Sequence, residues 1–197
     1  MPSQTDTFEN LGGLIARIKE KTDGDAVSVR DMMDALGRRA FGPVLVLTAL
    51  IAVLPTGAIP GMSILTGTVM LLLSLQLLFG ARQIWLPDSI MRRSIERRKL
   101  VASLDKARGV AERIDRFVHP RLTFLLGPPF HQAIALVAII FAISMYPLAI
   151  VPFGAFPAGL AFIVIGTGLM VRDGLLILIG IAVGAVGLAA AVQLWPF

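Results

Sequence analysis

Residues 54–60 read LPTGAIP and interrupt a stretch, 40–81, that contains no Lys, Arg, Asp or Glu. A proline inside a helix removes a backbone donor and clashes with the preceding turn. Pro55 and Pro60, with Gly57 between them, therefore leave several peptide groups without helical partners. In hydrocarbon such groups are tolerated only where they are buried in protein or line a polar cavity. The stretch predicts a helix that is broken within a membrane.

A near-copy of this stretch occurs in the second half of the chain, where residues 151–157 read VPFGAFP. Its Pro152, Gly154 and Pro157 follow the prolines and glycine of the first copy at a constant offset of 97 residues. Outside the interruptions, the copies share little beyond apolar character. Paired interruptions in corresponding halves are typical of repeat-built transporters, whose binding site lies at the interface between the repeats. We therefore predict a structural repeat.

The composition is that of an integral membrane protein. Of the 197 residues, 56% are hydrophobic and 16% are charged, whereas soluble domains carry about a quarter charged residues. The mean hydropathy is +0.80. Residues 122–171 and 174–197 also lack Lys, Arg, Asp and Glu, and each run exceeds the roughly 20 residues that a spanning helix needs. Cysteine is absent, which excludes disulfides, thiolate metal sites and cysteine nucleophiles.

The charged residues fall almost entirely into two segments. Residues 1–40 hold 6 basic and 7 acidic side chains, and residues 82–121 hold 11 basic and 5 acidic ones. A basic segment flanked by apolar spans is typical of a cytoplasmic loop that faces anionic lipid headgroups. We therefore predict a multi-pass membrane protein that contacts membrane lipid and does not bind nucleic acid.

These patterns define the fold class. Ser28 and Asp31 have the spacing of a capping box, which predicts the start of a helix, and the basic segment predicts helices at 89–100 and 103–118. We predict an all-α integral membrane protein with two Pro/Gly-broken helical hairpin repeats, re-entrant or spanning, plus amphipathic cytoplasmic helices. The four parts are cytoplasmic or interfacial amphipathic helices at 1–40, a first broken hairpin at 41–80, a basic amphipathic connector at 81–121, and a second broken hairpin with a C-terminal span at 122–197.

The first hairpin admits two topologies. Its first arm, 44–54, rises about 16 Å as a helix, roughly half of a hydrocarbon core of about 30 Å. Either the chain re-enters the side from which it came, or two tilted helices cross the membrane with a bend at the far side. Arg38, Arg39 and Arg82 flank the segment, so both of its ends are expected in the cytoplasm. We favour the re-entrant hairpin because the first arm is short.

Several short motifs occur in an order that resembles one family. They are LP at 54–55, IPG at 59–61, QLL at 76–78, WLP at 85–87, Pro152, and RDG at 172–174. With these motifs, which extend over roughly residues 35–190, the chain resembles the ExoD family of bacterial exopolysaccharide-synthesis membrane proteins. The resemblance implies a bacterial inner-membrane protein linked to exopolysaccharide production, and it implies no particular reaction.

The apolar segments offer little catalytic chemistry. They contain no Asp or Glu, so a carboxylate pair or a metal cage is hard to build, and we predict no enzyme activity, no cofactor and no metal. Peptide groups at the interruptions are better candidates, because free N–H groups at a helix start attract anions and free carbonyls accept cations or hydroxyls. The predicted substrate-binding residues there are Pro55, Thr56, Gly57, Pro60, Gly61, Pro152, Gly154 and Pro157.

Three further residues complete the predicted substrate site. Gln76 carries an amide on an otherwise apolar helix, and it either contacts substrate or forms a hydrogen bond between helices. Arg172 and Asp173 are adjacent, and adjacent residues on a helix do not face each other. They either form a turn at the cytoplasmic membrane edge, or Arg172 binds an anion while Asp173 accepts a proton or caps a helix.

Two functions are compatible with these features. The first is non-enzymatic movement of an anionic or polyhydroxylated solute or lipid intermediate in exopolysaccharide synthesis or export, which the paired interruptions favour. The alternative is a scaffold subunit that packs against synthesis or export components, which the N-terminal helices and the glycines of the last span favour. Broken helices this small need a neighbour to bury their peptide groups, so we also expect a homodimer.

Overall fold

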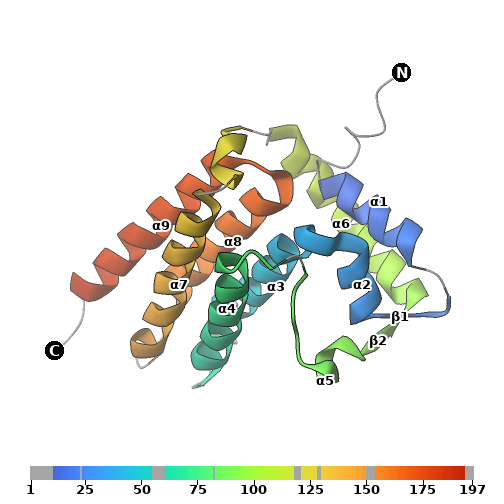
Figure 1. Ribbon diagram of the computed structural model, residues 1–197, viewed down its shortest axis with the longest axis horizontal. Coiled ribbons are helices and arrows are strands. Elements are labelled where there is room, and N and C mark those ends of the chain that lie inside the picture. Colours follow the sequence, from blue (N-terminus) through green and yellow to red (C-terminus); the bar gives the residue numbers. More distant parts are fainter. Residues whose placement is uncertain are drawn as a thin grey trace.

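The computed structural model has an apolar helical bundle on one side and a polar unit on the other (Figure 1). The structure describes residues 11–22, 24–54, 61–81, 83–117, 121–127, 130–149 and 154–193. Residues 55–60 of the first interruption and 151–153 of the second therefore lie outside the described residues. The regular secondary structure of the described part is helical apart from one pair of three-residue strands. This confirms the all-α class.

Five helices without a charged side chain form the bundle. They follow the apolar arms that the sequence predicts, because runs of Leu, Ile, Val, Ala, Phe and Gly can be surrounded by hydrocarbon on every side. The helices are α3 (Phe41–Val53), α4 (Met62–Leu78), α7 (Phe130–Leu148), α8 (Phe156–Val171) and α9 (Gly174–Gln193).

Helix α3 packs along α8, and the two run antiparallel. Their contact is close because glycines face the partner helix: a methyl group at Gly42 would lie 2.7 Å from the Gly166 carbonyl oxygen. At the other end, a methyl group at Gly159 would lie 2.7 Å from Cγ2 of Val53. A larger side chain at any of these glycines would force the helices apart. Small residues at such contacts are typical of membrane helix pairs.

Helix α4 packs along α7 in the same antiparallel manner. Gly67 of α4 faces Ala142 and Met145 of α7, and the Thr68 and Tyr146 hydroxyls share a hydrogen bond of 2.8 Å. Each helix of the first apolar segment thus pairs mainly with a helix of the second. The described helix ends beside both interruptions lie at the end of the bundle away from the polar unit (Figure 1).

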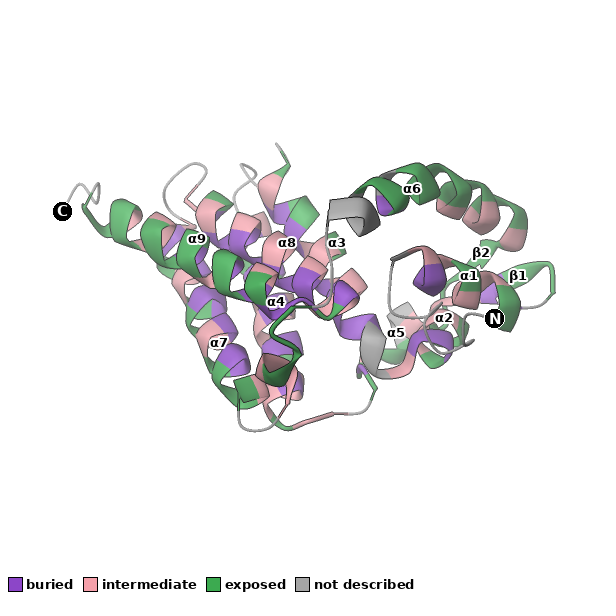
Figure 2. Cartoon of the chain, turned by 90° about the horizontal axis from the view of Figure 1, so that it is seen from above, coloured by how far each residue is buried: buried purple, intermediate pink, exposed green. Residues whose placement is uncertain are grey.

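Helix α9 packs on α8 through a row of glycines. A methyl group at Gly180 would lie 2.9 Å from the Ile165 amide nitrogen, and one at Gly184 would lie 2.9 Å from Cβ of Ala161. Gly187 continues the row. The close packing predicted for the glycines of the last span is therefore used inside the chain, while the remainder of α9 is largely exposed (Figure 2).

The polar unit joins two segments that are far apart in the sequence. Its elements are α1 (Leu11–Lys21), β1 (Ala26–Ser28), α2 (Val29–Leu36), the 3-10 helix η2 (Gly37–Ala40), α5 (Asp88–Met91), β2 (Ser94–Glu96) and α6 (Arg97–Phe117). The 3-10 helix η4 (Thr123–Leu126) contacts α7 and α9 of the bundle instead. The antiparallel strands pair Val27 with Ile95, and Val27 is fully buried. Helix α1 packs on α6, where Arg97 Nε donates to the Thr22 carbonyl oxygen just after α1, at 2.9 Å.

Helix α2 starts at the predicted capping box. The Ser28 hydroxyl accepts a hydrogen bond from the Asp31 amide at 3.1 Å, and the Asp31 carboxylate accepts one from the Ser28 amide at 2.9 Å. Hydrogen bonds from the Ser28 hydroxyl and then from its amide lower the pKa of Asp31 below its ordinary value. The predicted helix start is confirmed.

The prediction of a helix at 89–100 is wrong for the residues in the middle of that range. Residues 94–96 form β2 instead, and α6 begins only at Arg97. The Arg97 amide donates to the Asp25 carbonyl oxygen at 2.9 Å, so pairing with the chain around β1 holds this segment extended. A local pattern does not reveal a strand partner so distant in the sequence. Residues 103–117 of the helix predicted at 103–118 lie within α6, and residue 118 lies outside the described residues.

The bundle has the length and the surface of a membrane-associated structure. Helices α7 and α9, with 19 and 20 residues, are long and apolar enough to cross a membrane, while α3, α4 and α8 are apolar but shorter. Large apolar side chains point outward, among them Leu47 at 62%, Ile140 at 56% and Val186 at 70% exposure. An apolar surface of this extent is typical of a membrane contact.

The variant Gly180→Leu tests the contact between α8 and α9. The added side chain has to displace the α8 backbone, so we expect the free energy of unfolding to fall by about 1–3 kcal/mol, measured by thermal unfolding in detergent micelles. The control is Val186→Leu, at an outward position of the same helix, which should unfold like the parent protein. Equal stability of the two variants would contradict the contact.

Candidate functional site

A cavity of about 420 Å³ opens at the end of the bundle next to the polar unit. It is walled by the same end of four helices, namely the starts of α3 and α7 and the ends of α4 and α8. Each half of the chain therefore contributes two helix ends. The first half supplies Phe41, Gly42 and residues 77–81, and the second half supplies Leu126, His131, Gln132, Leu169 and Arg172.

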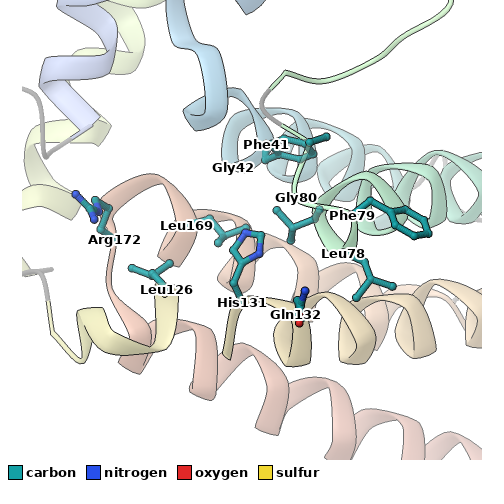
Figure 3. A pocket seen from close by; sticks show the side chains of 12 residues that line it. Phe41, Gly42, Leu78, Phe79, Gly80, Leu126, His131, Gln132, Leu169 and Arg172 are labelled. Carbon is teal, nitrogen blue, oxygen red and sulfur yellow. The ribbon is translucent and has the colours of Figure 1, made fainter. Parts of the chain in front are cut away.

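The cavity is cationic at one end and apolar at the other. Arg172 lies at one end, and Phe79, which is 83% exposed, lies at the opposite end (Figure 3). His131 and Gln132, in the first turn of α7, stand between them. None of the described residues that line the cavity is acidic. The potential around Arg172 therefore favours an anion.

Arg172 ends α8 in an uncommon backbone conformation. Its φ is 57° and its ψ is 36°, the left-handed region, which costs most L-residues roughly 1–2 kcal/mol. Helices often end this way, but usually with glycine at the position. The Arg172 amide still donates to the Gly168 carbonyl oxygen. An arginine is therefore present against the preference of the backbone, as is common at functional sites.

Asp173 is turned toward α9 and caps it. Its carboxylate accepts hydrogen bonds from the Leu175 amide at 2.8 Å and the Leu176 amide at 3.3 Å, and the residue is 3% exposed. A carboxylate at this position also stabilises the helix, because its negative charge lies beside the positive end of the helix dipole. Several roles were considered for Asp173, and these hydrogen bonds show that it caps a helix.

Gln76 lies on α4 and does not line the cavity. Its Nε2 donates to the Trp85 carbonyl oxygen at 3.1 Å, and its Oε1 accepts from the Trp85 amide. The side-chain amide thus binds a peptide group as a neighbouring strand would, and it holds the segment 83–86 beside the end of α4. The hydrogen bond considered for Gln76 is present, with a loop as the partner in place of a second helix.

Of the substrate residues predicted at the interruptions, the structure describes three, Gly61, Gly154 and Pro157, and none of the three lines this cavity. Gly61 precedes α4 with a φ of 91°, which favours glycine. Gly154 lies just before α8, and Pro157 in its first turn packs against Gly187 of α9. These three residues lie at the opposite end of the bundle from Arg172, so the structure does not bring them together with it. Those outside the described residues are Pro55, Thr56, Gly57, Pro60 and Pro152.

Among the described residues that line the cavity, Arg172 alone was a predicted site residue; His131, Gln132 and Phe79 were not predicted. Part of the signal was present, because two polar residues begin the otherwise apolar α7. Phe79 gave no signal, since an aromatic residue at the end of an apolar helix is common. Among the described residues, no three His, Cys, Asp or Glu side chains lie close enough to hold a metal ion, and the absence of a cofactor stays a prediction.

Comparison with known proteins places the chain in a family. A family model described as "Exopolysaccharide synthesis, ExoD" matches residues 11–193. Protein ExoD of Rhizobium meliloti (strain 1021) is 32% identical over 177 residues, which cover 89% of this chain and 71% of that protein. The chain belongs to the ExoD family. The resemblance seen in the short motifs is confirmed, and with it the link to exopolysaccharide synthesis.

The ExoD match includes both the polar unit and the bundle, because it runs from the first residue of α1 to the last residue of α9. An uncharacterized protein of Synechocystis sp. is 29% identical over 154 residues, which cover 78% of this chain and 71% of that protein. No solved structure matches the chain.

In this ExoD-family protein, Gln76→Ala tests whether the Gln76 amide holds the loop. The variant loses the hydrogen bonds between the Gln76 side chain and the Trp85 peptide group. We therefore expect the backbone amide of Trp85 to exchange with deuterium about tenfold faster. Mass spectrometry of peptides that cover residues 83–86 measures this rate. Leu72→Ala, at an exposed position of the same helix, is the control. If both variants exchange at the parent rate, Gln76 does not hold this loop.

Proposed function

We propose that this ExoD-family protein is a non-enzymatic, multi-pass component of exopolysaccharide synthesis or export in the bacterial inner membrane. In this proposal it binds, and helps to move, an anionic or polyhydroxylated solute or lipid intermediate. The observation that carries the proposal is the cavity with Arg172 at one end, which is walled by helices from both halves of the chain. Transporter sites commonly lie at such an interface.

The pairing of the helices supports the structural repeat. Helix α3 pairs with α8 and α4 with α7, so exchanging the two apolar segments converts one pair into the other. This pattern is expected of two broken hairpins related by an approximate two-fold axis along the bundle. A parallel repeat of this kind has both interruptions toward one side of the membrane and the cavity toward the other.

We propose a re-entrant first hairpin. Helix α3 has 13 residues and rises about 20 Å, which is less than a hydrocarbon core of about 30 Å. The polar unit is connected both to the start of α3 and to the end of α4. Its exposed cations, such as Arg92 and Arg93, support a cytoplasmic position of this side by the positive-inside rule.

The chemistry of the cavity supports a binding role without catalysis. The acid nearest to Arg172 in the sequence, Asp173, is bonded to two amides of α9, so it does not face the cavity as a general base. Arg172 supplies a permanent cation, and His131 and Gln132 supply groups that bind phosphate oxygens or hydroxyls. These residues can hold a ligand without an acid–base pair beside it.

The scaffold alternative rests on features that have partners inside this chain. The glycines of α9 contact α8 and α7, and helix α1 of the N-terminal segment packs on α6. Neither feature is therefore a free surface for another subunit, and movement of a ligand is the favoured function. The homodimer, and partners among synthesis or export components, stay predictions.

Filling the cavity tests the proposed function. In Gln132→Trp the indole occupies space between Arg172 and Phe79, so we expect exopolysaccharide output to fall to the level of a strain that lacks the protein. Hexose assays of secreted polysaccharide measure the output, and immunoblots of isolated membranes measure the amount of protein.

Ala133→Trp provides a matched control. Ala133 is the next residue of α7, is exposed and does not line the cavity, so this variant should keep the parental output. Full output from Gln132→Trp at the parental membrane level would remove the cavity from the mechanism.

A further inference from the structure

Building on the proposed function, we propose that the ligand of the cavity is an anionic amphiphile. Its phosphate head lies at Arg172, and its hydrocarbon chain leaves the cavity beside Phe79. A phosphate group at Arg172 could belong to a lipid or to free phosphate. The shape and the polarity of the cavity favour the lipid.

The head of the ligand is assigned by charge and hydrogen bonding. Arg172 is the one charged side chain among the described residues that line the cavity, and a guanidinium binds phosphate oxygens through paired N–H groups. His131 and Gln132 stand next along the cavity (Figure 3), and both carry hydrogen-bonding groups that suit further head-group oxygens.

The chain of the ligand is assigned by the apolar wall. From the head toward the far end, the cavity is lined by apolar side chains that include Leu169 and Leu78, and it ends at Phe79, which is 83% exposed. A small free anion would leave this wall uncovered. A hydrocarbon chain would cover it and gain the free energy of apolar contact.

The position of the cavity fits a lipid that enters sideways. The cavity lies where the apolar helices meet the polar unit, near Trp85, which is 66% exposed and belongs to a residue type enriched at membrane surfaces. Lipid headgroups occupy this level of a bilayer. An amphiphile can therefore place its head at Arg172 while its chain stays in the hydrocarbon beside Phe79.

The backbone at Arg172 makes the head assignment testable without unfolding the protein. Asparagine adopts a positive φ more readily than arginine does, so Arg172→Asn removes the cation while it relaxes the end of α8. Arg172 also has an interaction within the chain, so thermal unfolding of the variant is measured beside the parent, and binding is compared at a temperature where both are folded. A loss of binding in Arg172→Asn then reports the side chain and not the fold.

The binding experiment uses the full chain in phosphatidylcholine nanodiscs, with radiolabelled monododecyl phosphate as the probe and empty discs as background. Arg172→Asn should weaken probe binding by about tenfold to a hundredfold, because a charge-assisted hydrogen bond is lost. Phe79→Ala should weaken it by about fivefold to tenfold. The controls Arg92→Asn and Leu136→Ala, exposed positions outside the cavity, should bind like the parent.

Competition identifies which part of the ligand is recognised. Unlabelled monododecyl phosphate should displace the probe, whereas inorganic phosphate and dodecyl maltoside should require at least about a hundredfold higher concentration. Displacement by inorganic phosphate at equal concentration would overturn the lipid source, and equal displacement by dodecyl maltoside would overturn the anionic head. Parental binding by Arg172→Asn would overturn the whole inference.

The two proposals can fail separately. If Gln132→Trp abolishes polysaccharide output and the parent does not bind monododecyl phosphate, the amphiphile is overturned and the function of the cavity stands. If the parent binds the probe through Arg172 and Gln132→Trp secretes normally, the amphiphile stands and the proposed function is overturned.

Discussion

The close approach of α3 and α8 is the contact on which the rest of the molecule depends. Between helices surrounded by lipid, the hydrophobic effect gives little attraction, so association relies on van der Waals contact over closely fitting surfaces. Gly42 and Gly166 face each other across this contact, and Gly159 faces the end of α3. The glycines fix the antiparallel register, which brings the end of α8 beside the start of α3. The cavity exists because these two helix ends meet the corresponding ends of α4 and α7.

One corner of the chain, residues 172–174, serves the cavity and the bundle at the same time. Arg172 faces the cavity, and Asp173 caps α9 through two backbone amides. Gly174 leaves no space for a side chain, because a methyl group there would lie 2.5 Å from the Leu122 carbonyl oxygen. The three residues of the RDG motif thus have different structural roles. The corner turns the chain from α8 into α9 while it places one cation at the cavity.

The polar unit packs beside the end of the bundle at which the cavity opens. It forms only because segments on both sides of the first hairpin meet, with β1 paired to β2 and α1 packed on α6. Gln76 of α4 binds the Trp85 peptide group and keeps the loop after α4 against the bundle. The residues that precede this loop, Phe79 to Ala81, belong to the cavity wall. In this ExoD-family protein, contacts between the polar unit and the bundle therefore help to position residues of the cavity wall.

The sequence by itself determined the elements of this protein. Uncharged runs long enough for a bilayer, Pro and Gly at fixed positions, and the Ser28–Asp31 capping box are local signals, and each acts within a few turns of chain. The motif RDG also indicated Arg172 and Asp173, although it left their roles open. Only the tertiary structure decided that α3 pairs with α8, that residues 94–96 are a strand, and that His131, Gln132 and Phe79 share a cavity with Arg172. These outcomes depend on which surfaces meet across long sequence separations, and such contacts are set by packing, which a local pattern does not encode.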